Sequence, residues 1–328
     1  YGAPEAKGHG VPEVMEAMKR ASLDRYPDSS SGELRETIAR KHGVEPGSVL
    51  VVNGISQAIF LIAFAFADRG SAVVEVSPTY GEYAAASRLA GARVEEIRAP
   101  EETSFAFPAE RVEEAVLTGH PSMVWICSPN NPTGVLPSGE ELGTVTRACE
   151  KEGALLVLDE AYANFSTRGP SAGAGLSPSV LLLRSMTKDY ALTGLRLGYV
   201  LGDPSLVQVL AAVQPPWSVN ACAQECGLAA LGNGAYYEAT WRAARDLLSD
   251  LSDGLREAGF HPLPSQGNFV LFRAGDSNAL RSFLWKDRIL IRDCTSFGLP
   301  GYVRAGIRRR EENRMLVDRL RAFREGRS

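Results

Sequence analysis

Short runs of β-branched and other apolar residues alternate with helical patterns through the first two thirds of the chain, and this alternation restricts the fold more than any other feature. Strands that alternate with helices usually pair in parallel, because each crossover returns the chain to the same end of the sheet. The pattern predicts an α/β fold: a three-layer sandwich with a mostly parallel seven-stranded sheet and helices on both faces. The expected strands are 49–52, 72–76, 94–97, 123–127, 155–158, 180–183 and 197–201.

The alternation stops at Gln214-Pro215-Pro216, and a different pattern follows. A chain of 328 residues exceeds the usual size of one domain. We therefore predict a large domain over 31–219 and a smaller α+β domain formed by 1–30 and 220–328. In the smaller domain we expect helices over 235–258, 279–286 and 311–324 and strands over 268–272, 289–292 and 302–307.

Charge and apolar content exclude several classes of partner. The 35 Lys and Arg residues and 39 Asp and Glu residues give a net charge of −4, which provides no general attraction for nucleic acid or for an anionic membrane. The longest apolar stretch, 58–67, is far shorter than the roughly 20 residues of a membrane-spanning helix. The five cysteines show no paired spacing, so we expect free thiols and no metal site. These features predict a cytoplasmic protein without a nucleic-acid or membrane partner.

Three polar segments directly follow expected strands of the sheet. Open α/β sheets bind ligands outside the carboxyl ends of their strands, so these positions predict a ligand site. The segments are SPNNPTG at 128–134, DEAY at 159–162, and SMTK at 185–188, the last of them followed by GLRLG at 194–198.

A lysine, an arginine, two hydroxyl groups and an aspartate at one sheet edge indicate a particular kind of ligand. A desolvated lysine near other cations forms a Schiff base with a carbonyl compound. Hydroxyl groups, an arginine and the N–H groups of a helix start bind phosphate. An aspartate that faces a pyridine nitrogen keeps this nitrogen protonated, so that the ring withdraws electrons. Pyridoxal 5′-phosphate meets all three conditions, and we predict it as the cofactor.

Five segments of the sequence, in their order, resemble those of a known family. They are NGISQAI, SPTYGEY, SPNNPTG, LDEAY and SMTKDYALTGLRLGY. Together they resemble the fold-type I pyridoxal-phosphate enzymes of the class I/II aminotransferase group, over residues 26–313. The threonine-phosphate decarboxylases of the cobalamin pathway and the histidinol-phosphate aminotransferases are the most similar branches.

The resemblance implies a role for each matching residue around the cofactor ring. Lys188 would form the Schiff base with the cofactor and then carry protons. Asp159 would pair with the pyridine nitrogen, and Asn131 and Tyr162 would hydrogen-bond the phenolic oxygen. Tyr80 would stack on the ring face.

The resemblance also implies a phosphate site and a homodimer with shared active sites. Tyr26 is similar to a tyrosine that reaches the phosphate bound by the neighbouring subunit. The residues implied at the phosphate of the chain's own cofactor are Ile55, Ser56, Gln57, Ser185, Thr187 and Arg196.

Two arginines are implied as substrate ligands, so the expected substrate is a small anionic amino acid or amine. Arg304 resembles the residue that binds the α-carboxylate, and Arg292 resembles the one that binds a distal phosphate. A planar guanidinium suits either anion.

The segments around Trp217 and Arg308 favour decarboxylation of a phosphorylated or otherwise anionic L-amino acid as the leading hypothesis. The alternative is an aminotransferase that acts on a histidinol-phosphate-like amine or amino acid with a 2-oxo acid as acceptor. The N-terminal segment 5–10 departs from both branches.

A pyridoxal-phosphate-binding regulator is a more remote alternative. No GxGxxG follows a strand, which is unfavourable for a nucleotide-dependent dehydrogenase.

Overall fold

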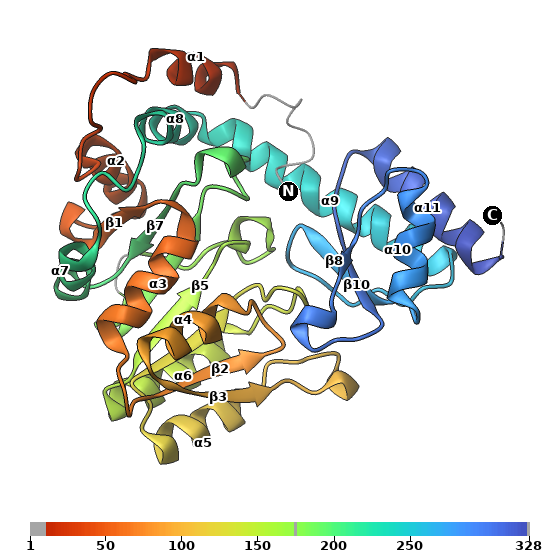
Figure 1. Cartoon of the computed structure of the whole chain (residues 1–328), viewed down its shortest axis with the longest axis horizontal. Helices are drawn as coiled ribbons and strands as arrows, with labels where there is room; N and C mark the ends of the chain where they lie inside the picture. The colour runs from red at the N-terminus through yellow and green to blue at the C-terminus, as the bar shows by residue number, and fades with distance from the viewer. Residues whose placement is uncertain (1–10, 174–175, 327–328) are drawn as a thin grey trace.

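A seven-stranded sheet forms the centre of the larger part of the molecule (Figure 1). The computed structural model describes residues 11–173 and 176–326, so the segment 5–10 lies outside the described residues. The sheet order is β1-β7-β6-β5-β4-β2-β3, and only β7 runs antiparallel to its neighbours. The predicted α/β fold is therefore confirmed. The strands are β1 (Val49–Val52), β2 (Ala72–Ser77), β3 (Arg93–Arg98), β4 (Met123–Cys127), β5 (Leu155–Asp159), β6 (Val180–Ser185) and β7 (Gly198–Leu201).

Both faces of this sheet are apolar and covered by helices. Alternate residues of a strand point to opposite faces, so Leu156 and Leu158 join one core while Leu155 and Val157 join the other. Helices α3 (Gly54–Phe66), α4 (Glu82–Ala90) and α7 (Pro204–Val213) cover one face. The other face is covered by α1 (Pro12–Arg20), α2 (Gly32–His42), α5 (Ala109–Gly119), α6 (Gly139–Glu152) and α8 (Ala221–Gly232).

Helix α3 contains residues 57–66, which their largely apolar composition predicts to be buried. Ala58, Ile59 and Ile62 are fully buried, but Phe64 is 56% exposed. The difference arises because a helix on a sheet face buries only the stripe that faces the sheet. No helix of the described residues is both long and apolar enough to cross a membrane.

A second, three-stranded antiparallel sheet lies in the C-terminal part of the chain, with the order β8-β10-β9. The strand expected at 289–292 was misplaced, because only Arg292 and Asp293 pair with β10. Ile289 and Ile291 pack in the core of this sheet and Leu290 is 72% exposed, but none of the three pairs in a strand. The elements are β8 (Phe269–Arg273), α10 (Ser277–Trp285), β9 (Arg292–Asp293), β10 (Tyr302–Gly306) and α11 (Arg310–Arg324).

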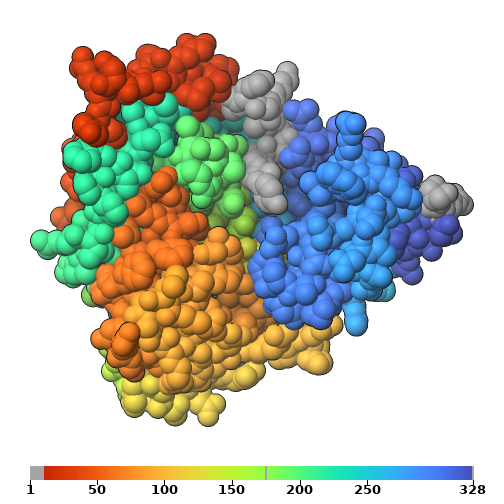
Figure 2. Space-filling view, in the orientation of Figure 1, coloured from red at the N-terminus to blue at the C-terminus, as the bar shows by residue number. Residues whose placement is uncertain are grey.

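Helix α9 (Gly234–Glu257) belongs to both parts of the molecule. Trp241 and Ala244 near its start join the core of the large sheet, whereas Leu247 and Leu251 join the core of the small sheet. The two parts form adjoining masses in the space-filling view (Figure 2). The predicted domain limits remain a prediction. Helices α1 and α8, which that prediction assigns to the smaller domain, pack on the large sheet.

Gly198 at the start of β7 lies in close contact with neighbouring backbone. A Cβ atom there would approach the Arg184 carbonyl oxygen to 2.8 Å and the Ile55 backbone nitrogen to 3.1 Å. We expect Gly198→Ala to lower the free energy of unfolding by about 2 kcal/mol, since neither backbone group can move independently. Gly194→Ala is the control because a Cβ there meets nothing within 4 Å. Urea unfolding of both variants measures the effect, and equal midpoints would contradict the expectation.

Candidate active site

Parallel pairing brings three polar strand ends to one edge of the large sheet. Asp159 ends β5 and pairs in register with Cys127 at the end of β4. Its other neighbour is Leu183, which is followed in β6 by Ser185. The predicted ligand site lies at this edge because these strands run in the same direction.

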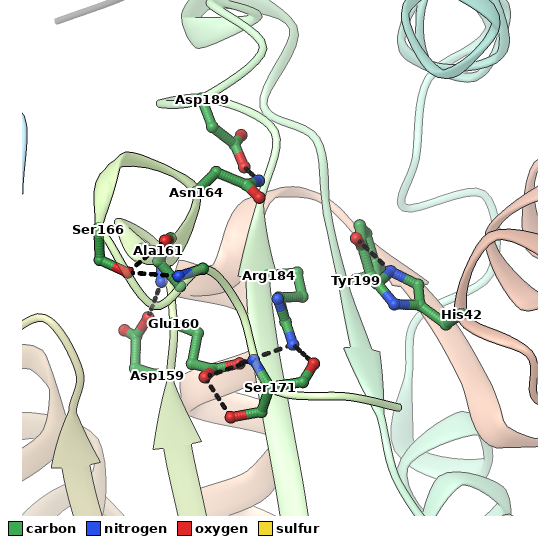
Figure 3. Close-up of polar contacts among 12 residues, drawn as sticks. His42, Asp159, Glu160, Ala161, Asn164, Ser166, Ser171, Arg184, Asp189 and Tyr199 are labelled. Atoms are coloured by element: carbon green, nitrogen blue, oxygen red, sulfur yellow. Dashed lines mark hydrogen bonds and ion pairs between the residues drawn. The ribbon is translucent and has the colours of Figure 1, made fainter. Parts of the chain in front are cut away.

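The Asp159 carboxylate is buried and held in a fixed orientation. The Tyr83 hydroxyl donates to its Oδ2 at 2.6 Å. The Ala161 backbone N–H donates to Oδ1 at 2.9 Å (Figure 3). Burial raises the pKa of Asp159 to about 6, although both hydrogen bonds act in the opposite direction. This carboxylate consequently sits in an environment that favours an incoming cationic partner such as a protonated pyridine nitrogen.

Tyr83 on α4 is a site residue that the sequence analysis missed. Its ring stacks on Trp125 with centroids 5.1 Å apart and meets the edge of Tyr80 at 5.7 Å. The sequence feature that could have identified Tyr83 is its position within SPTYGEY. It lies three residues after Tyr80 and therefore within one helical turn of it. Tyr83 connects the predicted ring-stacking residue to the buried carboxylate.

Lys188 is half-buried in the loop after β6. Burial lowers the pKa of its ammonium group, and the positive charges of Arg196 and Arg304 lower this pKa further. The Asp159 carboxylate acts in the opposite direction. Because these charges lie close enough to act on Lys188, the predicted lysine, aspartate and two arginines share one site. A lowered pKa makes the neutral, nucleophilic amine more abundant near neutral pH.

The start of α3 provides donors for an anion. Its N-cap residue Asn53 makes no side-chain capping bond, and Gly54 follows with φ of 70°. The Arg196 guanidinium approaches to 3.1 Å from the position a Gly54 Cβ would take. Ser56, in the first turn, shares a hydrogen bond with Tyr80. Uncapped N–H groups beside an arginine fit a phosphate group.

The other predicted phosphate ligands lie around this helix start. Ser185 and Thr187 are buried, and their hydroxyl groups are 2.7 Å apart. Ile55 contacts the backbone of Gly198. Gln57 is turned back on the chain, since its Oε1 accepts from the Asn53 backbone N–H at 2.8 Å. This donor set, with Asp159 at the neighbouring strand end, fits pyridoxal 5′-phosphate.

Arg304 connects the two sheets at the site. Its guanidinium donates to Asn131 Oδ1 and lies 4.7 Å above the ring of Phe269. Tyr162 meets the same ring edge-on at 5.0 Å. Phe269 was not predicted, and it forms the platform on which Arg304 and Tyr162 are placed.

A cavity of about 720 Å³ joins the lysine to the small sheet. Lys188, Tyr162, Arg304 and Arg292 all line it. Arg292 is exposed, and its Nη2 donates to Ser296 Oγ at 2.9 Å. Further arginines at this cavity are Arg281, Arg288 and Arg308. The cavity is therefore suited to an anionic compound.

Tyr26 does not line the cavity of its own chain. It is 80% exposed and stacks on the half-exposed Trp217, with ring centroids 4.7 Å apart. Its predicted contact with the neighbouring subunit's phosphate remains a prediction.

A buried ion pair lies behind the site. Arg184 and Glu160 are both buried, and their closest side-chain atoms are 2.7 Å apart. Glu160 also accepts from the Ser171 hydroxyl at 2.6 Å, and Arg184 donates to the Ser171 carbonyl oxygen (Figure 3). Glu160 directly follows Asp159 in the chain, so this network fixes the backbone next to the buried carboxylate.

The comparison with known families agrees with this geometry. The sequence model of the family described as aminotransferase class I and II matches residues 2–320. The chain belongs to this family, whose members are enzymes that depend on pyridoxal 5′-phosphate. The predictions of an enzyme and of this cofactor are confirmed.

Individual relatives bear on the reaction. The histidinol-phosphate aminotransferase of Caldanaerobacter subterraneus subsp. tengcongensis is 30% identical over 309 residues, which is 94% of this chain and 87% of that protein. The L-threonine-O-3-phosphate decarboxylase from Porphyromonas gingivalis has a similar structure, with a TM-score of 0.82, 27% identity and 95% of each chain covered.

The histidinol-phosphate aminotransferase from Sinorhizobium meliloti, solved in complex with pyridoxal-5′-phosphate, has the same fold. Its TM-score is 0.87 at 24% identity, with 98% of this chain and 90% of that chain covered. The comparisons thus favour the aminotransferase alternative over decarboxylation, which was our leading hypothesis.

Removing the Tyr83 hydroxyl should change the pH dependence of the enzyme. Its hydrogen bond lowers the pKa of Asp159, so Tyr83→Phe raises this pKa. On the predicted role of the ionised Asp159 carboxylate as partner of the pyridine nitrogen, we expect the acidic limb of the kcat profile to move upward by about one pH unit. Steady-state rates between pH 5 and 8 measure the shift. Tyr236→Phe on α9 is the control, and an unchanged acidic limb in Tyr83→Phe would contradict the role of this bond.

Proposed function

We propose that the protein is an aminotransferase that exchanges the amino group of a small anionic amine or amino acid with a 2-oxo acid. The observation that carries the proposal is a single cavity lined by Lys188, Arg304 and Arg292. Two guanidinium groups near one reactive amine suit a substrate with two anionic groups, such as an amino compound bearing a phosphate or a second carboxylate. Similarity to proteins named histidinol-phosphate aminotransferase supports a phosphate-bearing substrate.

The proposed roles of the residues around the cofactor follow from their charges and burial. When bound, pyridoxal 5′-phosphate supplies an electron sink for the substrate's α-carbon. Asp159 would hold a proton on the pyridine nitrogen, and Tyr83 keeps the carboxylate in place. Arg196 and the start of α3 would hold the phosphate, and Tyr80 would pack on the ring face.

Lys188 is the proposed proton carrier. Its lowered pKa leaves the amine available to take the proton from the substrate α-carbon and return it at another position. Arg304 binds the α-carboxylate and so sets the orientation of the bonds at this carbon. Asn131 and Tyr162, which lie beside Arg304, are the proposed ligands of the cofactor's phenolic oxygen.

Decarboxylation is the second candidate, because the structure resembles the decarboxylase from Porphyromonas gingivalis at 27% identity. The same cofactor supports both reactions, and the bond that is broken depends on how the substrate is held.

The products distinguish the two candidates. We expect the holoenzyme to form glutamate from histidinol phosphate and 2-oxoglutarate, and to release no carbon dioxide from threonine phosphate. Amino-acid analysis and a carbon dioxide assay measure these products. Carbon dioxide release without glutamate formation would reject transamination in favour of decarboxylation.

Two lysine variants test the cofactor assignment in the same assay. Lys188→Ala should lose the visible absorbance of the bound cofactor together with product formation. Lys286→Ala is the matched control, since this exposed lysine lies over the ring of Phe283 and outside the cavity. If Lys188→Ala retained the visible band, another residue would carry the cofactor.

The proposed assembly is a homodimer in which Tyr26 reaches the partner's site. The exposed Tyr26 and Trp217 pair and the exposed Phe64 on α3 support an apolar contact surface. We expect sedimentation of the pure protein at micromolar concentration to give twice the chain mass of 35.3 kDa.

Tyr26→Phe should weaken cofactor binding several-fold with the dimer intact. A monomer with full activity would contradict the shared site.

A further inference from the structure

Helix α9 is hydrogen-bonded directly to the loop that carries the catalytic lysine. We call residues 188–190 the lysine loop. The Trp241 indole Nε1–H on α9 donates to the Asp189 carbonyl oxygen at 2.8 Å. Trp241 is 8% exposed, and its ring meets Tyr190 at 5.5 Å in an edge-on contact. The peptide immediately after Lys188 therefore has a buried partner on another element.

The Asp189 side chain makes a second connection on the same side. Its carboxylate is buried and accepts from the Asn164 side-chain amide (Figure 3). It also accepts from the Tyr190 backbone N–H at 2.9 Å. Asn164 lies in the short helix η3 (Ala163–Phe165), which follows the Asp159 segment. The Asn164 carbonyl oxygen in turn accepts from Arg245 of α9 at 3.4 Å.

These contacts join three segments around a polar group that the proposed chemistry does not use. Burial raises the pKa of Asp189 to about 7, while Asn164 and the more distant Arg184 act in the opposite direction. The charge of this carboxylate contributes to raising the pKa of Tyr199 and Tyr237 without a hydrogen bond to either. Burying a carboxylate costs free energy unless hydrogen bonds compensate for the lost water. The hydrogen bond from Asn164 therefore stabilises Asp189 in this position.

We propose that Trp241 and the Asn164–Asp189 pair are positioning residues for Lys188, which tie the lysine loop to α9 and through it to the small sheet. The inference rests on the proposed catalytic role of Lys188. The far half of α9 packs in the small-sheet core through Leu247 and Leu251. A shift of that sheet on substrate binding would reach the lysine through one helix and one hydrogen bond.

The packing alone could also be explained if Trp241 only filled space in the core. One pair of variants distinguishes this role from the positioning of Lys188. Trp241→Phe keeps an aromatic ring but removes the N–H donor to the lysine loop. Tyr237→Phe is the matched control. Tyr237 lies one turn earlier on α9 and packs on Tyr190 with centroids 4.7 Å apart, and its buried hydroxyl has no hydrogen-bond partner. Each variant removes one polar group from the same aromatic cluster.

The first measurement uses the holoenzyme. We expect Trp241→Phe to lower kcat about 3- to 10-fold with less than a twofold change in KM, because the lysine is displaced while the substrate arginines are not. The pH midpoint of the bound cofactor's visible absorbance should shift by about 0.5 unit or more. Tyr237→Phe should leave kcat, KM and this midpoint at their wild-type values.

The second measurement uses the full chain without added cofactor. Reductive methylation with ¹³C-formaldehyde labels the lysines, and the NMR signal missing in Lys188→Ala identifies Lys188. Its titration midpoint should shift in Trp241→Phe and in Asn164→Ala, but not in Tyr237→Phe. Asn164→Ala provides the test if Trp241→Phe does not fold.

The outcomes separate this inference from the proposed function. If Trp241→Phe and Tyr237→Phe give the same Lys188 titration and the same kcat, Trp241 only fills space and the inference is wrong. If the Lys188 titration shifts as expected but Lys188→Ala keeps the visible band, the positioning contact stands and the proposed role of the lysine fails.

Discussion

The parallel pairing of β4, β5 and β6 is the constraint on which the rest of the site depends. It places Asp159 and Ser185 at one sheet edge, and it places Lys188 in the loop that leaves the same edge. The apolar residues of these strands are buried on both faces, so the sheet cannot shift its register without exposing a core. A rigid edge of this kind lets short polar segments, far apart in the sequence, keep fixed distances from one another.

Burial and neighbouring charges then act differently on the two ionisable groups at this sheet edge. Burial disfavours the charge of Asp159 and that of Lys188, while two arginines make the surroundings of the lysine positive. The pKa values of both residues are thereby shifted toward neutral pH, relative to those of an exposed aspartate or lysine. Burying these two ionisable groups lowers the stability of the fold, and the apolar cores on either side of the sheet offset this loss.

Much of this arrangement could be predicted from the sequence, for identifiable reasons. The β-branched runs carry a period of two, and the polar segments come immediately after them, so strand ends and Lys188 could be located without a structure. Phe269 and Trp241 could not. Each acts through a contact with a residue more than 50 positions away, and a single aromatic residue has no local pattern that distinguishes such a contact from ordinary packing. The strand expected at 289–292 was misplaced because Ile289 and Ile291 pack in the small-sheet core in alternation, as in a strand, without backbone pairing.

The contacts of Arg304 bear on how fast an anion can enter. In the described residues this guanidinium rests on the Asn131 amide and the Phe269 ring and forms no ion pair with a carboxylate. An arriving carboxylate therefore displaces a neutral partner and does not have to compete with a fixed negative charge. The long-range attraction between the arginines that line the cavity and an approaching anion is screened by salt, so salt should slow association more than it weakens the bound complex.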